Sequence, residues 1–126
     1  MRAERNTVQR QIVLDVVKNL GNHPSFDEVF TRINGEHPSI SKSTVYRNLR
    51  FLVESGKLRR VAMPDETDRY DYNNSKHYHF KCRTCEKIHD VGINYMDEIN
   101  ELVQRAHGFE VGEHEILFTG LCETCK

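Results

Sequence analysis

The sequence predicts an α+β protein with two parts: a helical N-terminal part that ends in a β-hairpin, and a smaller α/β C-terminal part held together by cysteines. Three amphipathic helical patterns with capping residues precede residue 57. Two short β-like runs then flank a polar turn at residues 64–67. All four cysteines of the 126-residue chain fall in two Cys-x-x-Cys units in the second half.

The first helix is predicted from the stretch NTVQRQIVLDVVKNL, with Asn6 or Thr7 as the candidate N-cap. Gly21 and Pro24 follow the pattern and are expected to end the helix. Its apolar stripe, at helical spacing, consists of Ile12, Val13, Val16, Val17 and Leu20.

The second helix is predicted to start at Ser25, because Ser25 and Glu28 form a capping-box pattern, and to stop at Gly35. Its apolar face consists of Phe26, Val29, Phe30 and Ile33. The third helix is predicted to start near Ser39 or Ser41 and to close at Gly56. Its apolar face consists of Val45, Leu49, Leu52 and Val53.

Three helices followed by a hairpin are typical of a winged helix-turn-helix, in which the last helix reads DNA. A polar and cationic stripe opposes the apolar face of the third helix and consists of Lys42, Ser43, Tyr46, Arg47 and Arg50. Cations suit phosphates, whereas the polar groups and the tyrosine ring suit base edges. A solvated cationic helix face would show the same stripe, so the helix alone leaves both interpretations open.

The two Cys-x-x-Cys units fit one tetrahedral zinc site with the ligands Cys82, Cys85, Cys122 and Cys125. Two disulfides or a redox dithiol are the alternatives. Structural disulfides are rare inside cells. The first cysteine pair also lies between two strand-like runs, rather than at the helix start that is usual for a redox pair. We therefore predict structural Zn(II).

The histidines nearby require a second site, because side chains alternate between the two faces of a strand. His77 and His79 share one face, and Cys82 points to the other. If the hairpin is symmetric, with Cys82 opposite Lys87, then His79 lies opposite Asp90 on the same face. The pattern therefore predicts a separate imidazole–carboxylate site.

Asp71 lies just before the polar joint NNSK, and a bend there would bring it to the imidazole–carboxylate site. Two imidazoles with carboxylates suit Fe(II), Mn(II) or Zn(II). A pair of surface histidines is the alternative. The joint places the predicted boundaries at residues 1–72 for the winged-helix domain, 73–76 for a hinge and 77–126 for the second domain.

Charge is distributed unevenly along a chain whose net charge is −1. Residues 1–63 carry a net charge of +5, and residues 64–126 carry −6. This asymmetry favours an anionic partner for the first half and bound cations in the second. No apolar run approaches the roughly 18–20 residues that a membrane span needs. The N-terminus lacks the apolar core of a signal peptide, so we expect a cytoplasmic protein that does not contact a membrane.

The chain resembles the ferric uptake regulator family of metal-dependent bacterial repressors over essentially its whole length. The motifs that carry the resemblance are STVYRNLRFLVESG, HYHFKCRTC and the closing CETC. Within the family, the chain is most similar to the peroxide-sensing branch. The resemblance implies a homodimer that represses transcription from a palindromic operator on double-stranded DNA, with the second domain dimerising. It does not imply an enzyme.

The resemblance also implies a ligand set for regulatory Fe(II) or Mn(II): His23, Asp71, His77, His79 and Asp90. His23 enters through the resemblance alone. Peroxide is then expected to oxidise a ligand histidine, with His23 and His77 as the targets, and so to release DNA. The expected DNA contacts are Arg10, Lys42, Ser43, Thr44, Tyr46, Arg47 and Arg50.

Three other interpretations remain open. An iron-responsive regulator of the same family would bind metal and DNA without sensing peroxide, although such members often have Glu where this chain has Asp71 and Asp90. Two histidines with carboxylates also occur in Fe(II) oxygenases, but five protein ligands leave little room for a substrate. A zinc-scaffolded module could instead use the third helix to bind a protein.

Overall fold

The computed structural model describes residues 2–64, 67–73 and 75–126, with side chains described from residue 5 onward. The chain divides into two compact units, Met1–Asn74 and Ser75–Lys126. Part of the predicted turn, at Asp65 and Glu66, and one position of the predicted hinge, Asn74, lie outside the described residues. No described helix combines the length and the apolar character that crossing a bilayer requires.

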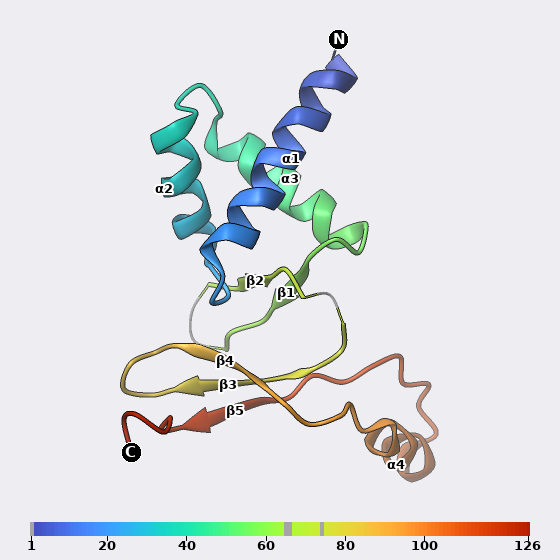
Figure 1. Cartoon of the computed structure of the whole chain (residues 1–126). Helices are drawn as coiled ribbons and strands as arrows, with labels where there is room; N and C mark the ends of the chain where they lie inside the picture. Colours follow the sequence, from blue (N-terminus) through green and yellow to red (C-terminus); the bar gives the residue numbers. More distant parts are fainter. Residues whose placement is uncertain (1, 65–66, 74) are drawn as a thin grey trace. The chain divides into compact units, whose positions relative to one another are not determined.

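The first unit has the helix order of a winged helix-turn-helix, as predicted (Figure 1). Its helices are α1 (Arg2–Leu20), α2 (Phe26–Glu36) and α3 (Lys42–Glu54), and α1 contacts both of the others. The strands β1 (Arg59–Val61) and β2 (Arg69–Asp71) follow and pair antiparallel, with Arg60 opposite Tyr70.

Capping residues explain where α2 and α3 begin. The Ser25 side chain accepts a hydrogen bond from the Glu28 amide (3.3 Å), and Glu28 Oε1 accepts one from the Ser25 amide (3.3 Å), so the capping box is confirmed. Ser41 caps α3 and accepts from the Thr44 amide at 3.2 Å.

Two predicted helix bounds were wrong. The helix α1 begins at Arg2, so neither Asn6 nor Thr7 caps it. The residues before them are good helix formers and extend the helix towards the N-terminus. The helix α2 continues through Gly35 to Glu36, because an isolated glycine weakens a helix without ending it.

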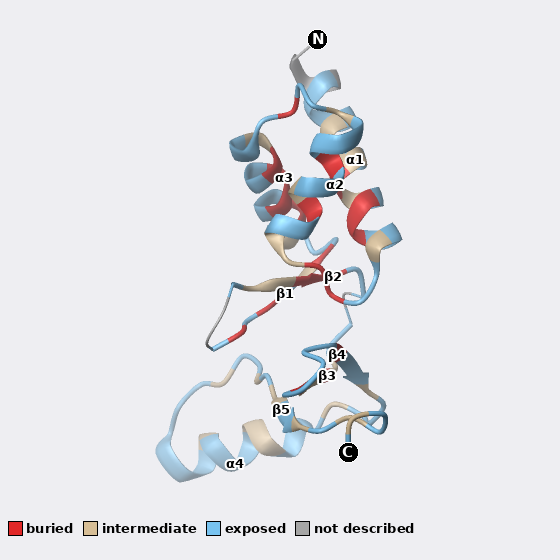
Figure 2. Ribbon diagram, turned by 90° about the vertical axis from the view of Figure 1, so that its left-hand side faces the viewer, coloured by how far each residue is buried: buried red, intermediate tan, exposed pale blue. Residues whose placement is uncertain are grey.

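The core of the first unit forms where the three helices face one another, shown in red in Figure 2. The predicted apolar stripes supply most of it. The buried cluster consists of Val13, Val16, Val17, Val29, Ile33, Ile40, Val45, Leu49, Leu52, Leu58 and Tyr70.

An unusual backbone run connects α1 to α2. Gly21, Asn22 and His23 all have left-handed conformations, with φ of 58°, 49° and 58°. Such a conformation costs a residue with a side chain roughly 1–2 kcal/mol. Contacts with β2 hold the end of the run, because the Tyr70 amide donates to the Pro24 carbonyl at 2.9 Å.

The second unit is a three-stranded sheet with one helix. Its elements are β3 (Tyr78–Cys82), β4 (Ile88–Val91), α4 (Asp97–His107) and β5 (Leu117–Gly120), and the strand order is β4-β3-β5. The strands β3 and β4 pair antiparallel with His79 opposite Asp90, as the symmetric hairpin predicted. The sequence pattern had not indicated that β5 pairs with β3 in parallel.

The helix α4 starts at Asp97, and the amide of its N-cap residue, Met96, donates to the Tyr78 hydroxyl (2.9 Å). It ends at His107, and the C-cap residue Gly108 has a left-handed φ of 70°.

Little apolar surface is buried in the second unit. Within residues 75–126, the buried apolar side chains are Tyr78, Cys82 and Ile88. The helix α4 contains no buried residue and is largely pale blue in Figure 2. Large apolar side chains are exposed in this unit, on α4 and in the segments outside it: Ile93, Met96, Leu102, Val103, Phe109, Phe118 and Leu121.

The left-handed run gives a prediction about the stability of the first unit. Gly21→Ala should lower the free energy of unfolding by roughly 1 kcal/mol, because alanine disfavours positive φ. An added Cβ would meet no atom within 4 Å at either Gly21 or Gly35. Gly35→Ala is therefore the matched control, and it should stabilise the unit by up to about 0.5–1 kcal/mol. Urea denaturation followed by circular dichroism measures both changes. Equal effects of the same sign would contradict the assignment of strain to this run.

Candidate functional site

The four cysteines gather in the second unit, and their sulfur atoms all lie within 4.8 Å of one another. All four are free thiols, and Cys85 Sγ lies 3.9 Å from Cys122 Sγ. A disulfide would require about 2.05 Å. Sulfur atoms at 2.3 Å from one tetrahedral ion are about 3.8 Å apart. The observed spacing therefore fits a shared ion better than it fits disulfides.

Backbone turns position both cysteine pairs. At the first pair, the Cys85 amide donates to Cys82 Sγ (3.5 Å) and the Glu86 amide to the Cys82 carbonyl (3.0 Å), while Glu86 has a φ of 61°. At the second pair, the Cys125 amide donates to the Cys122 carbonyl (3.1 Å). The parallel pairing of β5 with β3 brings the two turns together.

The electrostatics of the sulfur cluster favour a bound cation. Hydrogen bonds from the backbone of Cys122 and Cys85 lower the pKa of Cys82 to about 5. Hydrogen bonds to the neighbouring Cys122 and Cys82 sulfurs raise the pKa of Cys125 to about 12. The Cys82 thiol therefore ionises easily, and a bound cation would offset the repulsion between thiolates that disfavours ionisation of Cys125. The donor set and its geometry therefore fit structural Zn(II).

The opposite face of β3 carries a second group of ligands in the second unit. His77 Nε2 lies 3.1 Å from Asp90 Oδ1, and His79 Nε2 lies 3.5 Å from the same oxygen. The two imidazole rings are 4.4 Å apart between centroids. One imidazole nitrogen from each histidine and one carboxylate oxygen thus converge, as the strand alternation predicted.

The His77 ring is oriented for metal binding. Its Nδ1 lies 2.6 Å from the Ser75 carbonyl oxygen, which can only accept a hydrogen bond. Nδ1 therefore carries a proton, and Nε2 is the ring nitrogen that faces Asp90. Histidines that bind metals usually donate their second ring N–H to a carbonyl or carboxylate in this way. The group fits a divalent cation that prefers nitrogen and oxygen ligands.

The first unit holds two further candidate ligands beside each other. His23 Nε2 lies 3.2 Å from Asp71 Oδ2, and both side chains are about one-tenth exposed or less. The other carboxylate oxygen of Asp71 accepts a hydrogen bond from the Asn73 amide at 2.9 Å. That bond fixes the carboxylate so that Oδ2 faces His23.

His23 is the residue that reasoning from local patterns missed. It reaches Asp71 because the left-handed run at residues 21–23 turns the chain back onto β2, where Arg69 donates to the His23 carbonyl at 3.4 Å. A histidine directly before a proline normally favours extended backbone. The sequence Gly-Asn-His-Pro gives one weak signal, since glycine and asparagine tolerate left-handed conformations better than other residues do.

A polar network anchors β3 behind the imidazole–carboxylate site. Tyr78, which lies between the two histidines in sequence, is fully buried and points to the other strand face. Its hydroxyl lies 2.6 Å from His114 Nε2 and accepts a hydrogen bond from the Met96 amide at 2.9 Å. His114 Nδ1 lies 2.6 Å from Asn100 Oδ1, and the His114 ring stacks on Tyr95 at 4.3 Å.

These contacts fix the protonation of His114. The Asn100 side chain donates its amide N–H to the Tyr95 hydroxyl (3.2 Å), so its oxygen faces His114 and must accept. His114 Nδ1 therefore carries the proton, and Nε2 accepts from the Tyr78 hydroxyl. Both ring nitrogens are engaged, and the chain of bonds ties β3 to α4 and to the segment before β5.

The predicted DNA-reading stripe on α3 faces solvent. Five side chains are exposed: Lys42, Ser43, Tyr46, Arg47 and Arg50. Thr44 is half-buried and accepts a hydrogen bond from Arg47 at 3.1 Å, so it orients that guanidinium. Arg10 of α1 is half-buried, and its guanidinium carbon lies 3.9 Å above the centre of the Phe51 ring. It reaches the outer side of α3 from a neighbouring helix.

The buried network predicts the effect of removing one hydroxyl group. Tyr78→Phe should lower the free energy of unfolding by about 1–3 kcal/mol, because the Met96 amide and His114 Nε2 each lose a buried partner. Tyr72→Phe is the matched control, since Tyr72 is 48% exposed. Thermal or urea denaturation of the zinc-loaded protein measures both variants. Equal stability of the two variants would show that the network is not stabilising.

Comparisons with known proteins agree with this geometry. The Ferric uptake regulator family matches residues 2–119. The Peroxide operon regulator of Bacillus subtilis (strain 168) is 36% identical over 122 residues, covering 97% of this chain and 84% of that protein. The Peroxide-responsive repressor PerR of Staphylococcus epidermidis is 34% identical, covering 97% and 81%. The crystal structure of the Campylobacter jejuni peroxide stress regulator is similar, with a TM-score of 0.76, 29% identity and coverage of 98% and 93%. The resemblance expected from the sequence motifs is thus confirmed, and the chain belongs to the ferric uptake regulator family.

Proposed function

We propose that this protein is a metal-dependent transcriptional repressor that binds DNA with its first unit and releases it when peroxide oxidises a metal-ligand histidine. The convergence of His77, His79 and Asp90 on one strand face carries the proposal. These residues supply nitrogen and oxygen ligands, and they form a group separate from the four cysteines. Relatives named Peroxide operon regulator and Peroxide-responsive repressor PerR support the sensing role.

The proposed regulatory site uses all five predicted ligands for one Fe(II) or Mn(II) ion. His23 and Asp71 come from the first unit, and the other three come from the second. Neither group alone offers the five or six ligands that these ions prefer, and the nitrogen and oxygen donors suit them. The predicted hinge at residues 73–76 lies between the two groups, so filling the site would restrain the hinge.

A bound ion shifts a conformational equilibrium only by its differential affinity for the two states. A thousandfold preference for the DNA-binding arrangement corresponds to about 4 kcal/mol. When bound, Fe(II) supplies one-electron chemistry towards peroxide, which Mn(II) does not. His23 and His77 are the proposed sites of oxidation. Once oxidised, either histidine would no longer bind the ion, and the hinge would no longer be restrained.

DNA reading is assigned to the exposed stripe of α3, with Tyr46 and Arg47 placed for base edges and Lys42 and Arg50 for phosphates. Ser43, Thr44 and Arg10 complete the proposed contact set. The exposed apolar surface of α4 supports a homodimer, because a second copy would cover it. A twofold dimer reads two half-sites at a fixed spacing, so we propose a palindromic operator. Because the proposed partner is bacterial DNA, we also propose a cytoplasmic location.

The experiment measures binding of a DNA duplex that the wild-type protein has selected from a random-sequence pool. The zinc-loaded protein should bind the duplex with Mn(II) or Fe(II) and bind poorly after the regulatory metal is removed. Peroxide should abolish binding for the Fe(II) form only. Mass spectrometry should then find one added oxygen on a peptide bearing His23 or His77. If peroxide added oxygen only to methionines, the sensing mechanism would be contradicted. If the protein bound DNA equally well without the regulatory metal, the role of the ion would be contradicted.

An iron-responsive regulator without peroxide sensing is the alternative, and ligand chemistry separates the two. Asp90→Glu should keep metal-dependent DNA binding while reducing histidine oxidation, if peroxide sensing depends on the aspartate. Asp27→Glu, an exposed carboxylate in the first turn of α2, is the control. If histidine oxidation were unchanged in Asp90→Glu, the aspartate would not be what distinguishes a peroxide sensor from an iron-responsive regulator. A wild-type Fe(II) form that keeps its DNA and its histidines intact in peroxide would favour the alternative.

Sharing of one ion by the two units has a separate test. His23→Gln and Asp90→Asn should each weaken Mn(II) binding about tenfold or more, because even the loss of a residue that supports a metal ligand typically costs about 10- to 100-fold in affinity. His37→Gln, a histidine of the same unit as His23 outside the ligand set, should leave Mn(II) affinity unchanged. Isothermal titration of the zinc-loaded protein measures all three. If His23→Gln behaves like His37→Gln, the first unit does not supply a ligand.

A further inference from the structure

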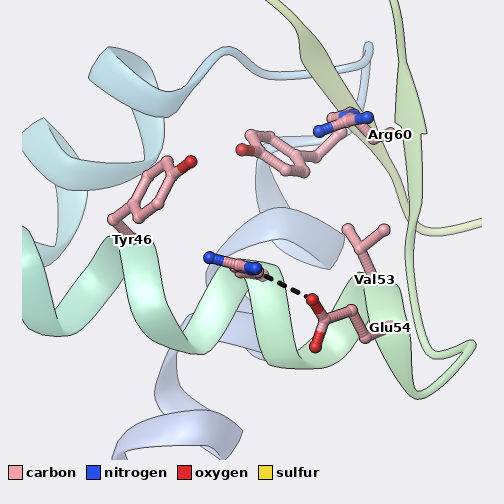
Figure 3. Close-up of a pocket in the computed structure, with 6 residues that line it drawn as sticks. Tyr46, Val53, Glu54 and Arg60 are labelled. Carbon is pink, nitrogen blue, oxygen red and sulfur yellow. Dashed lines mark hydrogen bonds and ion pairs between the residues drawn. The ribbon is translucent and has the colours of Figure 1, made fainter.

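A groove in the first unit lies between α3 and the β1–β2 hairpin (Figure 3). Its volume is about 310 Å³. The helix contributes one wall and the hairpin the other, and the residues that line the groove are Tyr46, Arg50, Val53, Glu54, Arg60 and Tyr70. Two of them, Tyr46 and Arg50, also belong to the proposed DNA-reading stripe. The groove is therefore continuous with that stripe.

Two guanidinium groups give the groove its positive charge. The Arg50 side chain is 70% exposed, and its Nε lies 3.0 Å from Glu54 Oε1. The Arg60 side chain is 61% exposed, and its Nε lies 3.4 Å from Asp68 Oδ2. A guanidinium has five N–H donors. Each of these ion pairs occupies Nε, which leaves the terminal nitrogens of both groups able to donate to an anion.

The remaining groups suit a phosphodiester. Tyr70 is only 7% exposed, and burial, together with the nearby Tyr46, raises the pKa of its phenol above the ordinary value. The Tyr70 hydroxyl therefore stays protonated. Val53 and the two tyrosine rings add apolar surface, which a deoxyribose can contact. Planar guanidinium forks bind phosphate oxygens well.

We propose that this groove seats a phosphate of the DNA backbone, that Arg60 is its contact from the hairpin, and that Glu54 competes with that phosphate for Arg50. The proposal rests on the DNA-binding function proposed above and extends it to three residues outside the predicted contact set: Arg60, Tyr70 and Glu54. The dashed line in Figure 3 marks the bond that the phosphate must displace or share.

The competition follows from charge. A phosphate that approaches Arg50 also approaches the Glu54 carboxylate, because the two side chains are hydrogen-bonded. Like charges at that distance repel, so the carboxylate lowers the affinity of the groove for DNA. Removing the Glu54 charge should therefore strengthen binding, whereas removing the Arg60 charge should weaken it. Opposite effects from two residues of one groove are a distinctive signature.

A second ion pair on α2 offers a matched control. Arg32 Nε lies 3.0 Å from Glu36 Oε1, with the same residue types, the same i,i+4 spacing and the same length as the Arg50–Glu54 pair. Neither residue lines the groove. Arg32→Gln and Glu36→Gln change the net charge of the unit by the same amounts as the groove variants. They correct for long-range electrostatic effects on DNA binding.

The experiment uses the full-length protein loaded with zinc and Mn(II), and the selected duplex as the probe. Fluorescence anisotropy gives the affinity at several salt concentrations. Arg60→Gln should weaken binding about three- to tenfold and reduce the slope of log K against log salt by about 0.9. Glu54→Gln should tighten binding about two- to fivefold. Arg32→Gln should change the affinity less than Arg60→Gln does, and Glu36→Gln should change it less than Glu54→Gln does.

Phosphate ethylation interference identifies the contact directly. For each half-site, Arg60→Gln should lose interference at one phosphate that the wild type and Arg32→Gln both require. Equal effects of the groove and control variants, or an unchanged interference pattern, would overturn the inference while leaving the DNA-binding function intact. Failure of the wild-type protein to select any duplex with Mn(II) would instead overturn the proposed function, and this inference with it.

Discussion

The alternation of side chains along β3 is the constraint on which the rest of the second unit depends. His77 and His79 lie on one face with Asp90 opposite, while Tyr78 and Cys82 point to the other face. A register slip of one residue would exchange these sets and place a thiolate among the imidazoles. Pairing on both sides, with β4 and with β5, holds the register. The short strand β3 can therefore position two metal sites of different chemistry, one on each of its faces.

This arrangement also explains how a unit with so small an apolar core can be ordered. Tyr78, Cys82 and Ile88 are the buried apolar side chains of residues 75–126, and α4 buries none. Such a core is small for independent stability. The sulfur cluster joins the chain end to the first cysteine turn, and the network of Tyr78 and His114 joins α4 to the same strand. Metal binding is then linked to folding as well as to regulation.

Local signals in the sequence predicted much of this structure, and long-range contacts account for the rest. The Ser25–Glu28 capping box, the cysteine pairs and the His79–Asp90 register follow from spacing within about a dozen residues, and the structure reproduces them. The position of His23 depends on three left-handed residues and on a strand almost fifty positions away. The parallel pairing of β5 and the role of His114 likewise depend on distant partners. No periodicity within a short window encodes such contacts.

X-ray absorption spectroscopy of the protein loaded with both zinc and manganese tests most directly whether the two faces of β3 carry separate sites. We expect about four sulfur atoms near 2.3 Å around zinc, with no nitrogen or oxygen ligand. We expect nitrogen and oxygen ligands alone around manganese. Sulfur at the manganese edge, or imidazole at the zinc edge, would mean that the two ligand sets mix, and the two faces of β3 would then not carry separate sites.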